Sequence, residues 1–288
     1  MDKILLINKD IGITSQGVVS RVKKLLNEPK AGHTGTLDPM ASGVLPILLG
    51  KATKLSKYFV EHNKRYIATL LLDKKSSTGD LEGQIIANKD ESTQINKEKV
   101  EEVLNSFIGK QKQTPSIYSA IKVNGKKLYE YARNGEEVDI PEREIEIYDI
   151  KLIDIDYDKK EITFEAFVSK GTYIRTLCED IAEKLGTVGM MVKLVRTTVN
   201  DFKIEDSITL EELENNLDNV DKYLIDPEML FESYGRIDLD ERKKDLFYNG
   251  VKLTFELEDG LYNIYSDNKY LGLGTIKEKL LKRDILFI

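Results

Sequence analysis

The sequence offers one carboxylate whose surroundings suit chemistry. Asp38 lies in a stretch of small residues, GHTGTLDPMASG (32–43), directly before Pro39. A residue that precedes proline is held in an extended conformation, which fixes the direction of its side chain. The glycines on both sides allow another chain to come close to the backbone. Because Asp-Pro pairs are also common in tight turns, local sequence leaves two interpretations open, a structural turn and a reactive carboxylate.

Side chains that bind metals or cofactors are few. The 288 residues include two histidines and a single cysteine, Cys178, which cannot form an internal disulfide and has no zinc-site spacing to its neighbours. No glycine-rich motif for a nucleotide phosphate or a dinucleotide occurs. We therefore predict that no metal and no cofactor takes part and that side chains alone do the chemistry.

Two strands and a helix are expected to position further polar side chains. Residues 65–73 (RYIATLLLD) read as a buried strand, and 161–170 (EITFEAFVSK) as a strand with apolar residues at every other position. After Gly171 the apolar spacing becomes helical over the next dozen residues. Tyr173 and Arg175 should therefore lie where a strand gives way to a helix.

Other segments carry weaker signals of secondary structure. Residues 3–9 (KILLINK) predict a strand, and Ser15 is expected to cap the helix that follows. Residues 97–109 predict an amphipathic helix whose final glycine is the C-cap. Thr209 and Glu212 have the spacing of a capping box at the start of an acidic helix.

The chain divides into two expected domains. From about Tyr234 the sequence changes to short strands separated by glycines, which predicts a small β-rich domain over residues 231–288. A domain of this size is marginal alone and should pack on its neighbour. Residues 1–230 mix strands and helices without regular alternation, so we predict an α+β domain there.

Charge is unevenly distributed along the chain. The net charge is −7, yet residues 201–288 carry 21 acidic and 12 basic side chains, whereas residues 1–200 carry 29 and 31. Residues 110–133 hold six basic side chains and one acidic one. A polyanion needs a positive face and not a positive total, so a nucleic-acid partner stays open beside a merely solvated lysine-rich surface. The apolar runs are too short for a bilayer and no secretory signal opens the chain, so we expect a cytoplasmic protein with no membrane partner.

Five stretches, in order, resemble the motifs of the TruB-type tRNA pseudouridine-55 synthases. They are NKDIGITSQGVVSRVKKLL (8–26), GHTGTLDPMASGVLPILLGKATK (32–54), KRYIATLLL (64–72), QTPSIYSAIKVNGKKLYEYARNGEEV (113–138) and VSKGTYIRTLCEDIAEKLG (168–186). The resemblance covers most of residues 1–200. It implies a mixed, mainly antiparallel central sheet flanked by helices, the pseudouridine synthase fold, with a PUA-like RNA-binding domain at the C-terminus.

The resemblance implies catalytic roles for three matched residues. Asp38 is the expected nucleophile, Arg175 its ion-pair partner, and Tyr66 the ring that stacks on a flipped uracil and assists proton transfer. Burial alone raises the pKa of a carboxyl group, and an adjacent arginine opposes this by about 1–3 units. An ion pair between Asp38 and Arg175 therefore makes chemical sense. Local sequence alone favours plainer roles, a packed tyrosine and a surface arginine.

The same resemblance implies contacts with RNA. Tyr173 is expected to line the pocket, Leu194 to close its apolar side, and His33 to pack among bases displaced from the RNA loop. Lys9 is expected to support the site. Phosphate contacts are expected from a basic stretch that contains Lys122, Lys126, Lys127 and Arg133.

The implied reaction converts a uridine in the T loop of tRNA, position 55, to pseudouridine. It breaks the N1–C1′ bond and joins C1′ to C5 without a redox change, so it needs no cofactor. Attack of the carboxylate on C1′ and a route through a glycal-like species both stay open. The expected partner is the tRNA T arm, with no guide RNA, and the protein is expected to be a monomer.

Departures from the family motifs and rival functions complete the expectations. Asp10 and Ser116 stand where the family has proline, and the loop around Asp80 differs from the usual pattern. These departures are expected to affect loop rigidity and RNA docking and not the central residues. One rival function is a guide-RNA-dependent synthase subunit, although the chain ends in RDILFI without a basic tail. The other is an RNA-binding protein that folds tRNA on the same scaffold, with catalysis secondary or lost.

Overall fold

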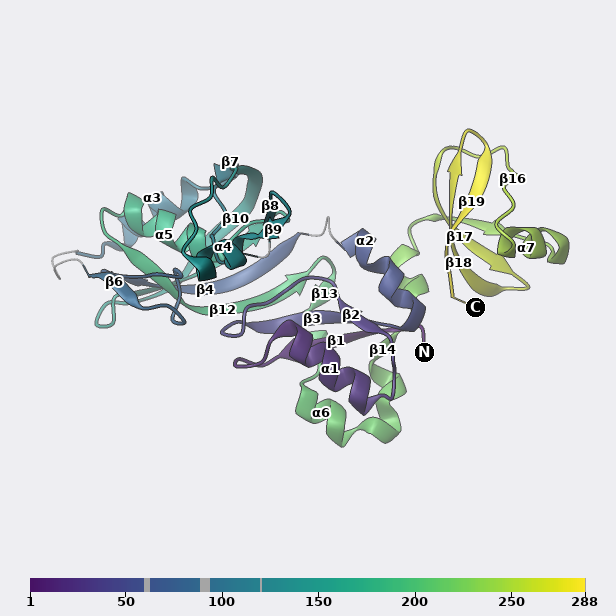
Figure 1. Cartoon of the computed structure of the whole chain (residues 1–288), viewed down its shortest axis with the longest axis horizontal. Helices are drawn as coiled ribbons and strands as arrows, with labels where there is room; N and C mark the ends of the chain where they lie inside the picture. The colour runs from purple at the N-terminus through teal and green to yellow at the C-terminus, as the bar shows by residue number, and fades with distance from the viewer. Residues whose placement is uncertain (60–62, 89–93, 120, 288) are drawn as a thin grey trace.

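The computed structural model describes residues 1–59, 63–88, 94–119 and 121–287 (Figure 1). Its larger part is built on a sheet in which the described residues form ten strands, in the order β14-β1-β3-β12-β4-β11-β10-β7, with β2 beside β3 and β13 beside β12. The pair β12–β3 is parallel, and the other paired strands of this sheet run antiparallel. The predicted α+β class with a mainly antiparallel central sheet is confirmed.

The strands of the central sheet span the following residues. They are β1 (Ile4–Lys9), β2 (Ala31–His33), β3 (Ser42–Leu49), β4 (Lys64–Leu72), β7 (Gly109–Gln113), β10 (Arg143–Asp156), β11 (Glu161–Val168), β12 (Gly189–Val199), β13 (Phe202–Lys203) and β14 (Leu224–Ile225). Strand β11 buries every second side chain, as its alternating apolar residues predict. Strand β4 pairs with β11 on one edge and with β12 on the other.

Helices cover the sheet in two groups (Figure 1). Helices α3 (Lys97–Asn105) and α5 (Ile174–Lys184) bury apolar side chains against β4, β10, β11 and β12. Helices α1 (Ser15–Leu25) and α6 (Leu210–Asn215) pack on the part of the sheet that contains β1 and β3. The first core lies beneath the start of α5, where the sequence places Tyr173 and Arg175.

Three of the expected helix ends can be compared with the structure. The capping box is confirmed, because Thr209 N donates to Glu212 Oε2 (2.7 Å) and Glu212 N donates to Thr209 Oγ1 (3.1 Å). The prediction that Ser15 caps α1 is wrong, since the Thr14 hydroxyl accepts the bond from Gly17 N. The predicted end at Gly109 is also wrong, because Ser106 is the C-cap and the glycine opens β7. In both cases a neighbouring residue with an equally suitable side chain or backbone takes the cap.

A second sheet contains β15 (Gly235–Asp238), β16 (Leu253–Thr254), β17 (Gly260–Ser266), β18 (Lys269–Lys277) and β19 (Leu280–Leu286). Its order is β15-β17-β18-β19-β16, and α7 (Glu241–Tyr248) packs beside it at one end of the molecule (Figure 1). Leu273 and Ile285 belong to this sheet but lie outside its own core, in an apolar cluster with Ile4 and Leu48 of the larger sheet. The β-rich segment is therefore joined to its neighbour by a shared apolar cluster.

Short elements surround these sheets. They are α2 (Ser56–Phe59), α4 (Leu128–Asn134), the hairpins β5 (Lys74–Ser76) with β6 (Ile85–Asn88) and β8 (Lys122–Val123) with β9 (Lys126–Lys127), and four 3-10 helices at Gly50–Leu55, Ile204–Asp206, Leu217–Tyr223 and Pro227–Phe231. Among the helices that the described ranges contain, none combines the length and the apolar character that a membrane span requires.

Candidate active site

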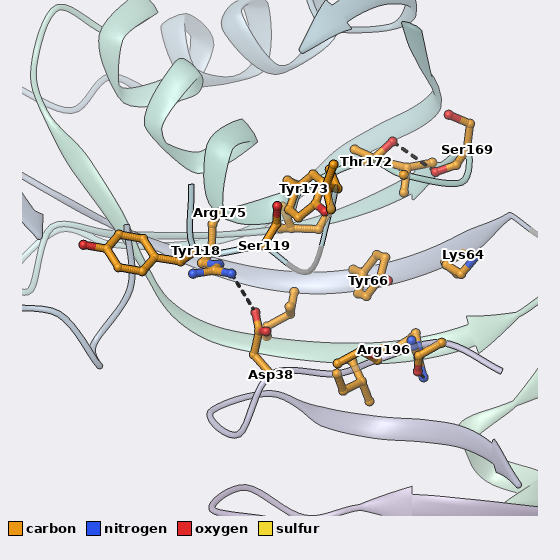
Figure 2. A pocket seen from close by; sticks show the side chains of 18 of the residues that line it. Asp38, Lys64, Tyr66, Tyr118, Ser119, Ser169, Thr172, Tyr173, Arg175 and Arg196 are labelled. Atoms are coloured by element: carbon orange, nitrogen blue, oxygen red, sulfur yellow. Dashed lines mark hydrogen bonds and ion pairs between the residues drawn. The ribbon is translucent and has the colours of Figure 1, made fainter. Parts of the chain in front are cut away.

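A cavity of about 590 Å³ opens where the loop after β2, strands β4 and β12, and the start of α5 meet. Of the residues with expected roles, Asp38, Tyr66, Tyr173, Arg175 and Leu194 all line it. Figure 2 shows the first four of these. The structure thus brings together five of the seven predicted residues from segments more than 150 positions apart in the sequence. Their meeting is a consequence of the sheet order, in which β4 and β12 are neighbours.

Hydrogen bonds from the N-terminal segment to the backbone of the Asp38 loop fix that loop. The Ser15 hydroxyl donates to Leu37 O (3.0 Å) and accepts from Leu37 N (2.8 Å). Gly12 N donates to Pro39 O (2.8 Å) on the other side of the aspartate. Because both flanking residues are held, the carboxylate has a fixed origin while its side chain stays 37 % exposed.

Arg175 is shared between two carboxylates. Its Nη2 lies 3.3 Å from Asp38 Oδ2, and its Nη1 lies 3.0 Å from Asp80 Oδ2 and donates to Thr78 O (3.2 Å). Figure 2 shows the arginine facing Asp38 at the edge of the cavity. A cation beside a carboxylate favours the ionised form of that carboxylate, so this arrangement suits a site that needs Asp38 charged.

Asp80 corrects one expectation from the sequence. Its loop was expected to affect only rigidity and RNA docking, yet this carboxylate is 1 % exposed and bonds directly to Arg175. Thr78 Oγ1 (2.5 Å) and Glu82 N (3.0 Å) donate to its other oxygen. The sequence carries one signal for this loop, the two glycines that flank Asp80, Gly79 and Gly83. In the structure the second glycine allows a close approach, since a Cβ at Gly83 would lie 2.4 Å from Thr78 Oγ1.

Negative charge is crowded around this arginine. Partial burial raises the pKa of Glu82, and the nearby carboxylates of Asp80 and Asp38 raise it further. Burial likewise raises the pKa of Glu179, one turn along α5 from Arg175. The surroundings of Arg175 therefore carry at least as much negative as positive charge.

Three side chains, those of Tyr66, Leu194 and Tyr173, shape the rest of the cavity. Tyr66 of β4 is 8 % exposed and Leu194 of β12 is 7 % exposed. Tyr173 is the N-cap of α5, and its backbone is held on both sides by Gln113, whose Oε1 accepts from Tyr173 N (2.8 Å) and whose Nε2 donates to Tyr173 O (3.1 Å). A flat, mostly apolar ring would fit such a wall.

Lys9 and His33 do not line the cavity. The Lys9 ammonium is fully buried behind the Asp38 loop, where it donates to Asp10 O (2.8 Å) and Pro39 O (3.4 Å). Burial lowers its pKa to about 8, opposed by the charges of Asp10 and Asp38. His33 lies at the end of β2, and burial together with the charge of Arg196 lowers its pKa.

Sequence reasoning missed two further residues at the cavity, Ser119 and Arg196. The Ser119 hydroxyl is buried and has no hydrogen-bond partner in the part of the chain that the structure describes. Arg196 is 1 % exposed. Its signal was available, because a residue two positions after Leu194 on a strand points to the same side of the sheet.

The basic segment borders the cavity through its tyrosines. Tyr118 and Tyr129 line the cavity, and the Arg133 guanidinium lies over the Tyr129 ring at 5.3 Å. Lys126 is bound to Glu136 (2.7 Å), whereas Lys122 is exposed at the open end of the β8–β9 hairpin, opposite Lys127. Part of this segment's charge is thus already paired, and part faces solvent. Ser116, the neighbouring departure, accepts a hydrogen bond from Tyr118 N (3.2 Å).

A second cavity, of about 630 Å³, lies between α2 and strands β18 and β19. Five basic side chains line it although the C-terminal segment is acidic overall: Lys57, Lys252, Lys277, Lys282 and Arg283. Lys57 and the Tyr58 hydroxyl both bind Asp284. No ion pair is formed by the other three lysines within the described ranges.

Comparison with known proteins gives consistent matches. Residues 23–174 match the model of the TruB family pseudouridylate synthase N-terminal domain, and residues 175–232 match that of the tRNA pseudouridylate synthase B C-terminal domain. The chain is 41 % identical to the tRNA pseudouridine synthase B of Clostridium kluyveri, with 100 % of both chains covered. It is 43 % identical to that of Clostridium acetobutylicum, with 98 % of both covered.

Solved structures show the same fold. The chain is similar to a Cbf5–Nop10–Gar1 complex, with a TM-score of 0.73 and 25 % identity over 98 % of this chain and 83 % of that one. It is also similar to an H/ACA RNP bound to a substrate RNA containing 2′-deoxyuridine. There the TM-score is 0.71 and the identity 23 %, over 99 % of this chain and 85 % of that one, which is a likeness of fold.

Proposed function

The chain belongs to the TruB family of pseudouridylate synthases, and we propose that it converts a uridine in the T loop of tRNA, at position 55, into pseudouridine. The observation that carries this proposal is the Asp38 carboxylate, held by Arg175 at 3.3 Å on the wall of a cavity that Tyr66 and Leu194 also line. The names of the relatives, tRNA pseudouridine synthase B, support tRNA as the substrate.

A uridine reaches such a cavity only when it leaves its stack. Flipping a nucleotide out costs a few kcal/mol, and stacking on an aromatic ring returns about 1–3 kcal/mol per base. Tyr66 provides this ring, and Leu194 covers the apolar side of the base. Tyr173 completes the wall next to Arg175.

The chemistry begins at Asp38. The Asp38 carboxylate initiates cleavage of the N1–C1′ bond, either by attack on C1′ or through a glycal-like species. The uracil then rotates, and C5 joins C1′. Lys9 supports this step indirectly, because its two hydrogen bonds hold the backbone on which Asp38 stands. His33 packs among the bases that the flipped nucleotide leaves behind.

Two surfaces are proposed to hold the RNA backbone. The first is the basic hairpin β8–β9 with α4, which borders the catalytic cavity through Tyr129. The second is the basic cavity of residues 231–288, which we propose form an accessory RNA-binding domain. Its unpaired lysines explain how an acidic segment can still meet phosphate, because the basic side chains gather in one place. We propose that the protein works as a monomer and without guide RNA.

Release of tritium from C5-labelled uridine in a T-arm RNA tests this function. Wild type and Asp38→Asn are compared without metal and without guide RNA. We expect release by the wild type and none by the variant, since only an ionised carboxylate starts the reaction. Tight RNA binding by the wild type without release would instead support the tRNA-folding function, and equal release by both proteins would refute the role of Asp38.

A further inference from the structure

Two buried arginines line the catalytic cavity and are partnered in opposite ways. Arg175 binds two carboxylates. Arg196 has no carboxylate within ion-pair distance among the residues that the structure describes, although it is more deeply buried. A buried charge without a counter-ion is strongly unfavourable unless hydrogen bonds and nearby charge compensate it. The position of Arg196 therefore needs an explanation beyond packing.

The bonds of Arg196 connect two parts of the site. Its Nε donates to Val44 O of β3 (2.9 Å), and its Nη2 donates to Gly35 O (3.2 Å), in the loop that leads to Asp38. Tyr66 is its register partner on the neighbouring strand β4. Both acceptors are neutral, so the positive charge of the guanidinium stays uncompensated at the wall of the cavity.

We propose that the charge of Arg196 stabilises the negative charge that uracil acquires as its bond to the ribose breaks. This inference rests on the proposed function. When the N1–C1′ bond breaks, its electron pair leaves with the uracil ring and spreads over the ring carbonyls. When C5 attacks C1′, these electrons, delocalised through the ring, form the new bond; C1′ gives up its bond to Asp38, or on the other route the glycal regains the proton it lost at C2′. The proton on C5 then leaves to solvent and N1 takes one up, so the product is an isomer of the substrate. Arg196 itself exchanges neither proton nor electron.

The place of Arg196 in the cavity brings its charge to the substrate. It lines the cavity beside Tyr66, its register partner on β4, whose ring is the proposed platform for the uracil. Charge placed in advance where an anion develops, in a site that excludes water, is among the largest contributions to catalysis.

The contrast with Arg175 makes Arg196 the suitable group. Because Arg175 is shared by Asp38 and Asp80, with Glu82 close by, its surroundings offer no net positive charge to a departing anion. Arg196 faces the same cavity with its charge uncompensated. An arginine also fits better than a lysine, because its planar fork reaches acceptors in two directions at once.

The test compares uridine with 5-fluorouridine in the same T-arm RNA, with enzyme in excess. Fluorine withdraws electrons from the ring, so the fluorinated base needs less help to leave with negative charge. Loss of the N-glycoside is measured in single turnovers by nuclease digestion and chromatography. The ratio of the two rates within one protein is independent of the fraction folded.

We expect Arg196→Met to slow the uridine reaction by about 10–100-fold and the 5-fluorouridine reaction by clearly less. Arg196→Lys, which retains the charge, should keep the ratio near that of the wild type.

Equal slowing of both RNAs in Arg196→Met would overturn the inference and leave a structural role. If that variant does not fold, Arg196→Gln decides, because equal slowing of both RNAs by this neutral, hydrogen-bonding side chain would likewise rule out a role for the charge. Failure of the wild type to convert uridine would instead overturn the proposed function itself, so the two failures are distinguishable.

Discussion

Replacing Asp80 with asparagine should separate the support of Arg175 from the chemistry of Asp38. The carboxylate accepts bonds from Thr78 Oγ1 and Glu82 N on one oxygen and from Arg175 Nη1 on the other. An amide has only one oxygen. If that oxygen faces Thr78 and Glu82, the amide nitrogen faces the guanidinium at about the present 3.0 Å, donor against donor.

The size of the effect follows from these contacts. Removing one partner of a buried ion pair costs about 3–5 kcal/mol, but Asp38 still partners Arg175, so we expect a loss of about 2–3 kcal/mol in the free energy of unfolding. If the same interaction holds the arginine in the transition state, the single-turnover rate falls by about 30- to 150-fold. Asp38 itself keeps its place, because Ser15 and Gly12 hold its loop.

Asp73→Asn is the matched control. Asp73 is also a buried carboxylate, bound to Lys160 Nζ (2.6 Å) and Thr187 Oγ1 (2.6 Å), but it does not line the catalytic cavity. Urea unfolding and single-turnover tritium release are measured on both variants. We expect both to lose stability and only Asp80→Asn to lose rate per folded molecule. Unchanged rates in both variants would refute the view that Asp80 holds Arg175 for catalysis.

Three further predictions concern other parts of the molecule. Burial lowers the pKa of Lys9 from 10.5 to about 8, so between these values the unfolded chain binds more protons and the free energy of unfolding should rise with pH; in urea titrations Lys9→Met should abolish that rise, and an unchanged rise would show that Lys9 is not its source. Gly43→Ala should cost several kcal/mol in thermal unfolding, because φ is +112° and a Cβ would lie 2.2 Å from Arg196 O, whereas Gly135→Ala, at φ +66° with open space, should cost only about 1–2 kcal/mol; similar losses would refute the close approach. The last change replaces three lysines of the second cavity, Lys252, Lys277 and Lys282, with glutamine. It should reduce the slope of log affinity for tRNA against log salt by about 0.9 for each phosphate that the variant no longer neutralises. An unchanged slope would exclude the second cavity from RNA binding.

Sequence reasoning succeeded where a residue's position depends on its own segment. The alternation in β11 and the change of period after Gly171 were enough to place Tyr173 and Arg175 at the start of α5. The resemblance to a family then gathered Asp38, Tyr66 and Leu194 into one site, and the structure brings them to one cavity. Their individual roles stay predictions.

The residues that were missed act through partners far away in the sequence. Asp80 looks like one more acid in a polar loop, and only the fold brings it within 3.0 Å of Arg175, 95 positions later. Arg196 looks like an ordinary strand arginine until β3 and β4 pair on either side of β12. The predicted N-cap of α1 was wrong for a different reason. Thr14 and Ser15 are both good N-cap residues, and local sequence does not choose between them.

The apolar cluster shared by the two sheets affects how the chain folds during synthesis. Ile4 and Leu6 are made more than 250 residues before Leu273 and Ile285, with which they share an apolar cluster. At about 5–20 residues per second, this apolar surface waits on the order of ten seconds to a minute for its cover. During that time it is exposed to other chains and to chaperones. Slow translation anywhere between the two groups lengthens this time and should therefore lower the yield of soluble protein.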